Sequence, residues 1–153
     1  MTQKSNIIEN NNNLWFKSIS FWAIILFGIA LRFYFQIGHI FSDDAYYSYL
    51  SHSLISNHFT NDYLGYPVFP LRIGQIAFTS FAFSLLGTSE FAALVFPFLI
   101  SILNLILTYK LSLYITENKN TALTAALLMA LFPTDVVFAT LNFPDLINVF
   151  FIN

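Results

Sequence analysis

Apolar and polar stretches alternate along the chain in lengths typical of membrane helices. The first apolar stretch predicts a helix over 14–35, within which 18–31 carries no charged residue. About 20 mostly apolar residues cross a bilayer, so this helix is long enough. Arg32 lies near its far end, where we expect the long side chain to extend outward to the membrane interface. Lys4 and Lys17 precede the apolar core, but no small-residue cleavage motif follows it, so we interpret the helix as an uncleaved anchor.

Three more uncharged apolar runs follow, at 73–89, 91–109 and 120–134. The second is the clearest membrane span, because it combines sufficient length with many Leu, Ile and Phe residues. The third must extend to Val137 or Phe138 to cross fully. Pro133 is expected to end or kink it, because proline cannot donate a helical hydrogen bond.

The two ends of the chain differ in character. Residues 1–13 are polar, finish in the run Glu9–Asn13, and are predicted to be disordered and cytoplasmic. The last apolar run, 146–152, meets the chain end, and a helix begun at Pro144 would cover only about half of the hydrocarbon core. We therefore expect 14–153 to be a membrane domain, the N-terminal portion of a larger, truncated protein.

The region 36–70 is polar enough to be an aqueous or interfacial loop. Within it Ser42 is a good helix N-cap, and Asp43 and Asp44 follow in the first turn, where carboxylates suit the helix dipole. Apolar and polar side chains then separate onto two faces, with Tyr46, Leu50 and Leu54 opposite Ser48, Ser51 and His52. This pattern predicts a short amphipathic helix lying on the bilayer.

Composition supports the membrane interpretation. Hydrophobic residues make up 57% of the chain and charged residues 9%, against roughly 25% charged in soluble domains. The net charge of −2, with no basic patch, argues against a nucleic-acid partner. The chain has no cysteine, and His39, His52 and His58 lack metal-ligand spacing. We conclude that the chain is an integral membrane protein, of all-α, multi-span class.

Lysine positions indicate the topology. The N-terminal lysines favour a cytoplasmic N-terminus in the cell membrane, which puts 36–70 outside. If 73–89 crosses, Lys110 and Lys119 fall outside; if it lies in the outer leaflet, both fall inside. We favour the second arrangement, which also brings Asp145 to the outer side. Four polar side chains in or near this segment support half-burial, namely Gln75, Thr79, Ser80 and Ser84.

Short motifs occur in a particular order along the chain. They are Leu31–Tyr34, Ser42–Tyr47, Gly65–Pro70, Leu85–Ala92, Phe132–Pro133 and Asn142–Asp145. In this order the chain resembles the N-terminal part of a polyprenyl-phosphate-dependent membrane glycosyltransferase. The class includes protein O-mannosyltransferases, the lipid A aminoarabinose transferase and other members of glycosyltransferase family 39. The resemblance implies an enzyme that takes a lipid-linked sugar at the outer membrane face.

The resemblance also implies catalytic residues. Asp43 corresponds to the first acid of the outer-loop motif, which serves as catalytic base in the family. Asp44 takes the place of the second acid, which is often Glu. Asp145 corresponds to a later carboxylate near the acceptor or an ion, so a divalent cation is a conceivable cofactor.

The chemistry of sugar transfer adds binding candidates. The acceptor needs a base, and a carboxylate can provide it. The departing phosphate needs its charge offset, which Arg72 and Arg32 could do. Tyr46 and Tyr66 belong to a group of tyrosines suited to stacking on a sugar. The expected partners are the lipid-linked donor and membrane lipids, with an acceptor that the sequence does not identify.

Other interpretations stay open. Asp43 and Asp44 can simply cap the interfacial helix, Asp145 can be a first-turn helix residue, and Arg32 can serve only as an interfacial anchor. A small transporter or channel fragment would bury a polar site near mid-membrane, whereas these carboxylates fall in loops or at span ends. A non-catalytic membrane scaffold would not need Asp43 and Asp145 to converge.

Overall fold

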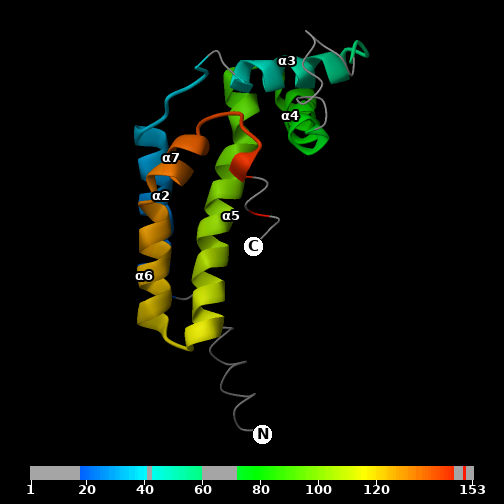
Figure 1. Cartoon of the computed structure of the whole chain (residues 1–153). Coiled ribbons are helices and arrows are strands. Elements are labelled where there is room, and N and C mark those ends of the chain that lie inside the picture. The colour runs from blue at the N-terminus through cyan, green and yellow to red at the C-terminus, as the bar shows by residue number, and fades with distance from the viewer. Residues whose placement is uncertain (1–17, 41–42, 60–71, 147–149, 151–153) are drawn as a thin grey trace, which may run out of the picture.

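A computed structural model describes residues 18–40, 43–59, 72–146 and 150, and every structural statement below concerns these residues. They form helices joined by short connections, with no strand among them, which confirms the all-α class. The helices are α2 (Ile19–Tyr34), α3 (Asp43–Ile55), α4 (Ile73–Leu86), α5 (Glu90–Thr116), α6 (Lys119–Ala130) and α7 (Pro133–Phe138) (Figure 1).

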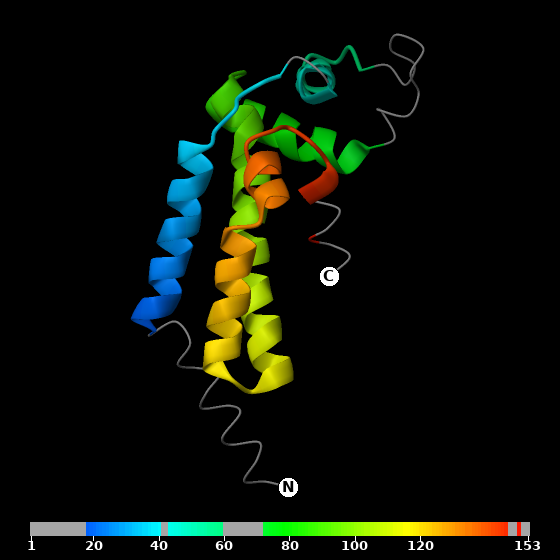
Figure 2. The same ribbon diagram turned by 60° about the vertical axis from the view of Figure 1, so that its left-hand side comes forward.

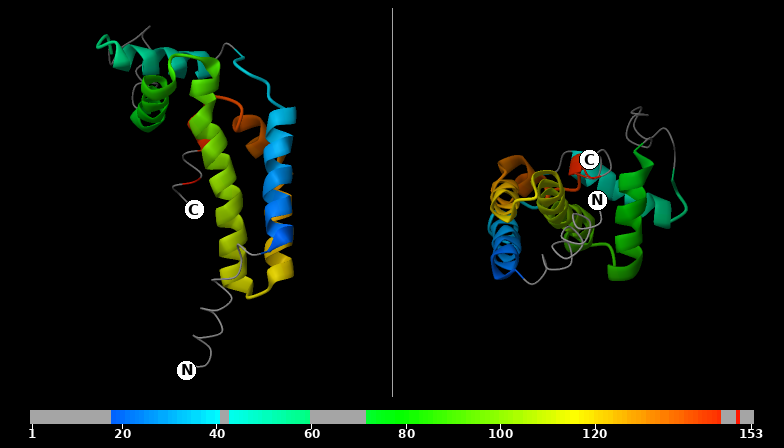
Figure 3. Two further views of the ribbon diagram at one scale, coloured as in Figure 1. Left: turned by 180° about the vertical axis from the view of Figure 1, so that it is seen from behind. Right: turned by 90° about the horizontal axis from the view of Figure 1, so that it is seen from below.

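Three of the helices run lengthwise and two lie across one end. The helices α2, α5 and α6 pack side by side, with α5 running opposite to the other two (Figures 1 and 2). The helices α3 and α4 lie across the end at which α2 finishes and α5 begins, and they project to one side of the bundle (Figure 3). Helix α4, which covers most of the run 73–89 that was predicted to remain in the outer leaflet, therefore does not run lengthwise beside α5.

Helix α5 is the one described helix long and apolar enough to cross a membrane. It begins at a good N-cap, because the Ser89 hydroxyl accepts the backbone N–H of Ala92 at 3.2 Å. Its 27 residues continue well past Lys110, where the apolar run ends. Lysine is a good helix former, so its charge does not stop the helix. That several helices of this protein cross the membrane stays a prediction.

Pro133 separates α6 from α7, as predicted. Helix α6 ends at Ala130, and α7 starts at Pro133 itself. The first position of a helix suits proline, because that N–H would have no helical partner. The break turns the chain so that α7 lies against the end of α2 (Figure 2).

The bundle core combines large residues with a row of small ones. Its buried members are Phe21, Ile25, Leu105, Tyr109, Ala122, Ala126 and Ala130. The alanines recur every four residues and so form one face of α6. At Gly28 an added Cβ would lie 2.9 Å from Leu105 Cδ1, so α2 approaches α5 closely there.

The buried face of α3 differs from the predicted one. The helix starts at Asp43 as expected, and Ser42 lies outside the described residues. Ser51 is buried and not exposed, and its backbone carbonyl accepts the Ser80 hydroxyl of α4 at 2.9 Å. The prediction that Ser51 faces water is wrong, because a small side chain there lets α4 pack against α3.

Candidate functional site

The junction of α3 and α4 holds an arginine in a fixed position. Arg72, which directly precedes α4, donates a hydrogen bond to the hydroxyl of Tyr47 on α3. Its guanidinium carbon lies 5.8 Å from the centre of the Tyr47 ring, within range of a cation–π contact. Arg72 is exposed and Tyr47 is buried, so a rigid phenol orients a charge that solvent or a ligand can reach.

Two carboxylates lie near the same phenol. The pKa of Tyr47 is raised, chiefly by burial, and the negative charges of Asp43 and Asp145 raise it further, while Arg72 lowers it. The two aspartates are therefore close enough to act electrostatically on one hydroxyl. Both are exposed. Asp43, Asp145 and Arg72, three of the residues that the sequence singled out, thus all influence Tyr47, and of the three it is Arg72 whose contact with Tyr47 is direct.

Asp44 has different surroundings from Asp43. Its side chain is fully buried, and Oδ2 accepts the backbone N–H of Ile40 at 2.8 Å. The same oxygen lies 3.0 Å from His39 Nδ1. Asp44 therefore fastens the chain that leads from α2 into α3, which fixes the position of Asp43 beside it. A carboxylate so enclosed does not contact a substrate in this arrangement.

A buried amide links the segment before Asp145 to both transverse helices. Asn142 donates to the Ser48 hydroxyl of α3 at 2.8 Å. Its oxygen accepts from the Thr79 hydroxyl of α4 at 3.0 Å and from the Gln75 side chain. The polar residues that indicated half-burial of α4 thus find protein partners. Sequence reasoning missed the role of Asn142, although it lies inside one of the quoted motifs.

Arg32 points inward and not outward. Its side chain is fully buried and pairs with Asp135 at the start of α7. It also donates to the Ser101 hydroxyl at 2.6 Å and to the Gly28 carbonyl at 2.8 Å. The prediction that Arg32 extends to the interface is therefore wrong, since an opposite charge is available within the bundle. With its donors used internally, Arg32 is not available to a phosphate in this arrangement.

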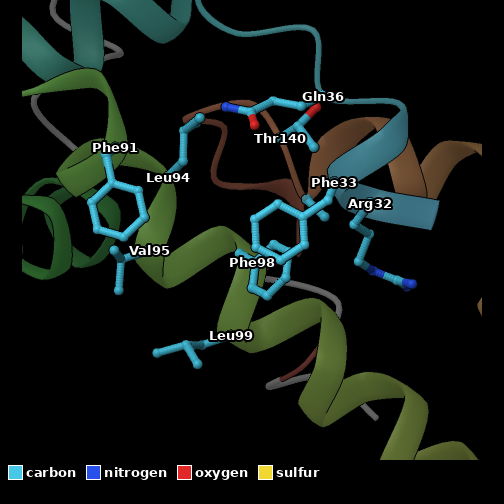
Figure 4. A pocket seen from close by; sticks show the side chains of 10 residues that line it. Arg32, Phe33, Gln36, Phe91, Leu94, Val95, Phe98, Leu99 and Thr140 are labelled. Carbon is cyan, nitrogen blue, oxygen red and sulfur yellow. The ribbon is translucent and has the colours of Figure 1, made fainter. Parts of the chain in front are cut away.

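An apolar cavity lies between α2 and α5, beside Arg32. Its volume is about 240 Å³. Figure 4 shows Phe33 of α2 close to Phe98 of α5, and the polar residues of the lining are Arg32, Gln36 and Thr140. The lining suits an apolar group. It offers no carboxylate or histidine for chemistry.

The remaining candidates are less well placed. Tyr46 is half-buried and stacks on Tyr49 with ring centres 6.5 Å apart, and Tyr66 lies outside the described residues. Within the described ranges, no group of three or more His, Cys, Asp or Glu side chains could hold a metal ion.

Comparisons with known proteins add no relative: no family model, curated protein or solved structure matches this chain. The resemblance drawn from the motifs remains a prediction. The geometry of the α3–α4 end is therefore the basis for any functional assignment.

Proposed function

We propose that this protein is a membrane glycosyltransferase that moves a sugar from a polyprenyl-phosphate donor to an acceptor at the extracytoplasmic face. One observation carries the proposal. Exposed Arg72, Asp43 and Asp145 come from three separate segments and all act on one buried tyrosine, Arg72 by direct contact and the two aspartates through their charge.

The proposal includes a membrane setting. Helix α5 would cross the bilayer, with α2 and the α6–α7 pair crossing beside it. The end with α3 and α4 would lie at the outer surface and the α5–α6 turn in the cytoplasm. Lys119, in the first turn of α6, then follows the positive-inside rule.

Each residue has a distinct task in the proposed reaction. Asp43 accepts the proton of the acceptor as the acceptor attacks the sugar carbon. The bond from that carbon to the phosphate oxygen breaks, and the phosphate leaves with the electron pair. Arg72 offsets the charge that develops on this phosphate. Asp145 orients the acceptor, and Tyr47 keeps the Arg72 guanidinium in place.

The test is sugar transfer by the purified complete protein, given a polyprenyl-phosphate-linked sugar. Asp43→Asn keeps size and helix-capping ability, because Asn caps as well as Asp. Loss of a general base should lower turnover by about 10²- to 10⁴-fold at unchanged abundance. Glu117→Gln, at the opposite end of the bundle, is the matched control and should be silent. Near-normal turnover of Asp43→Asn, or absence of transfer by the native protein, would overturn the proposal.

A transporter is the second candidate, because Arg32 and Asp135 form a buried ion pair beside the break between α6 and α7. Buried charges next to interrupted helices are typical of transport sites. The double variant Arg32→Met with Asp135→Leu separates the two functions. A transferase should keep its activity, since the α3–α4 end is untouched, whereas transport through this pair should stop.

A further inference from the structure

Asn142 is a fully buried amide that contacts both transverse helices. Its nitrogen donates to the Ser48 hydroxyl of α3 at 2.8 Å, and its oxygen accepts from two side chains of α4, Gln75 and Thr79. Asp145 follows three residues later in the chain. One side chain therefore joins all three segments that carry the proposed site.

The hydrogen bonds of this amide reach the parts of α3 and α4 that lie next to the site residues. Ser48 donates its own proton to the backbone carbonyl of Asp44 at 3.0 Å. Asp44 belongs to the first turn of α3, together with Asp43. On α4, Gln75 lies in the first turn, three residues after Arg72. The amide thus fixes the starts of both helices relative to each other.

Phe143, the next residue, adds an apolar contact on the same side. It packs against a buried cluster between α3 and α4 that includes Tyr47. A segment that is anchored at two successive residues has little conformational freedom. The place of Asp145, two residues further on, is therefore restricted by the same contacts.

The orientation of the Asn142 amide is fixed at a cost to Gln75. The Ser48 proton is donated to the Asp44 carbonyl, so Ser48 accepts from the Asn142 nitrogen. The Asn142 oxygen then faces α4, and Gln75 presents its nitrogen to that oxygen. Gln75 Oε1 is left buried without a partner among the described residues. A buried acceptor without a donor is costly, and proteins retain such costs chiefly at functional sites.

We propose that Asn142 is a positioning residue, which holds Asp43, Arg72 and Asp145 in the relative places that sugar transfer requires. It does not contact the substrate, because it is fully buried. A residue that aligns others acts mainly on kcat, since a misplacement of about 1 Å can lower a rate by about 10²-fold. The effect on turnover rests on the proposed transferase function. The effect on the place of Asp145 is measurable without any transfer.

The first test compares kcat and KM of the purified complete protein, with kcat expressed per folded molecule. Asn142→Ala should lower kcat by about 10- to 100-fold and change KM for the donor less. Thr79→Val removes one donor to Asn142 while keeping the shape of the side chain, so it should fold and lower kcat by a smaller factor. Thr108→Val is the matched control and should leave kcat unchanged, because the Thr108 hydroxyl donates within its own helix, α5. A purely structural role would lower the folded fraction alone.

The second test uses 3-fluorotyrosine at position 47 as a reporter, read by fluorine NMR of the whole chain in detergent. The charge of Asp145 raises the pKa of Tyr47, so Asp145→Asn should lower the pKa of the reporter. In the Asn142→Ala background the same substitution should have little effect, because Asp145 is no longer held near the phenol. In the Thr108→Val background the full lowering should persist.

The inference fails on any of three results. They are no effect of Asp145→Asn on the reporter in the native chain, its full effect in the Asn142→Ala background, and an unchanged kcat per folded molecule in Asn142→Ala. If Asn142→Ala does not fold, Thr79→Val takes its place in both tests. Absence of transfer by the native protein, with the Asn142-dependent change of the reporter intact, would refute the transferase alone.

Discussion

Asp43 and Asp44 are neighbours in sequence with opposite surroundings. Asp43 is exposed, whereas the carboxylate of Asp44 is buried, accepts the Ile40 N–H and lies against His39. Helix geometry explains the difference, because adjacent residues point about 100° apart. Only one of the pair can therefore face an acceptor.

This contrast predicts different effects on stability. Asp44→Ala should lower the free energy of unfolding by about 1–3 kcal/mol, because it removes a hydrogen bond from the Ile40 N–H to a buried carboxylate. Asp43→Ala should change stability far less, since that side chain is exposed. Chemical unfolding in detergent, followed by circular dichroism, measures both. Equal effects of the two substitutions would contradict the assigned roles.

Residue contacts over long sequence separations were beyond prediction. Arg32 and Asp135 are 103 residues apart, and periodicity shows that each interrupts an apolar stretch without showing that they meet. The same holds for Asn142, whose partners Ser48 and Thr79 lie on different helices. By contrast, the lysine positions predict that Asp145 is on the same side of the membrane as the acidic pair, and this stays a prediction.

Whole helices were more predictable than their ends. Charge-free apolar runs located α2, α4, α5 and α6, because a run with few charges must be buried in protein or lipid. The apolar run ends at Tyr109, but α5 continues to Thr116, since Lys110 is compatible with a helix. The turn is instead made by Glu117 in the left-handed conformation, at φ 52°, and by the Asn118 side chain, which caps α6.

Close packing between helices depends on Gly28. A Cβ there would lie 2.9 Å from Leu105 Cδ1 and 3.5 Å from Ala130 Cβ. The end of the Leu105 side chain can shift, and Ala favours a helix over Gly, but Arg32 Nη1 lies 3.1 Å from that Cβ and is held by the Gly28 carbonyl. Gly28→Ala should therefore cost less than about 1 kcal/mol. Gly28→Val adds branched bulk and should cost about 1–3 kcal/mol through overpacking. Thermal unfolding compares the two variants, and a Val variant as stable as Ala would show that the helices are farther apart.

For the molecule as a whole, the Arg32–Asp135 pair joins α2 to α7, and Ser101 adds α5. Removing one charge leaves the other buried and unpaired. Arg32→Met should therefore destabilise the protein by about 3–5 kcal/mol.

The double variant distinguishes a charge effect from simple loss of volume. Combining Arg32→Met with Asp135→Leu replaces the pair by apolar side chains and should restore most of the stability. Denaturant unfolding of the single and double variants gives the coupling energy. If the losses of stability in the two single variants simply add up in the double variant, the ion pair does not hold these helices together.

The arrangement in the membrane is the central claim, because it puts Asp43, Arg72 and Asp145 on the side where a lipid-linked sugar would be used. The chain has no cysteine, so single cysteines can be introduced at exposed positions as unique thiols. His52→Cys and Thr88→Cys report on the α3–α4 end, and Asn120→Cys reports on the α5–α6 end.

An impermeant thiol reagent applied to intact cells measures the exposure of each position. We expect labelling at 52 and 88, and labelling at 120 only after the cells are opened. Labelling of 120 in intact cells, or protection of 52 and 88, would contradict it.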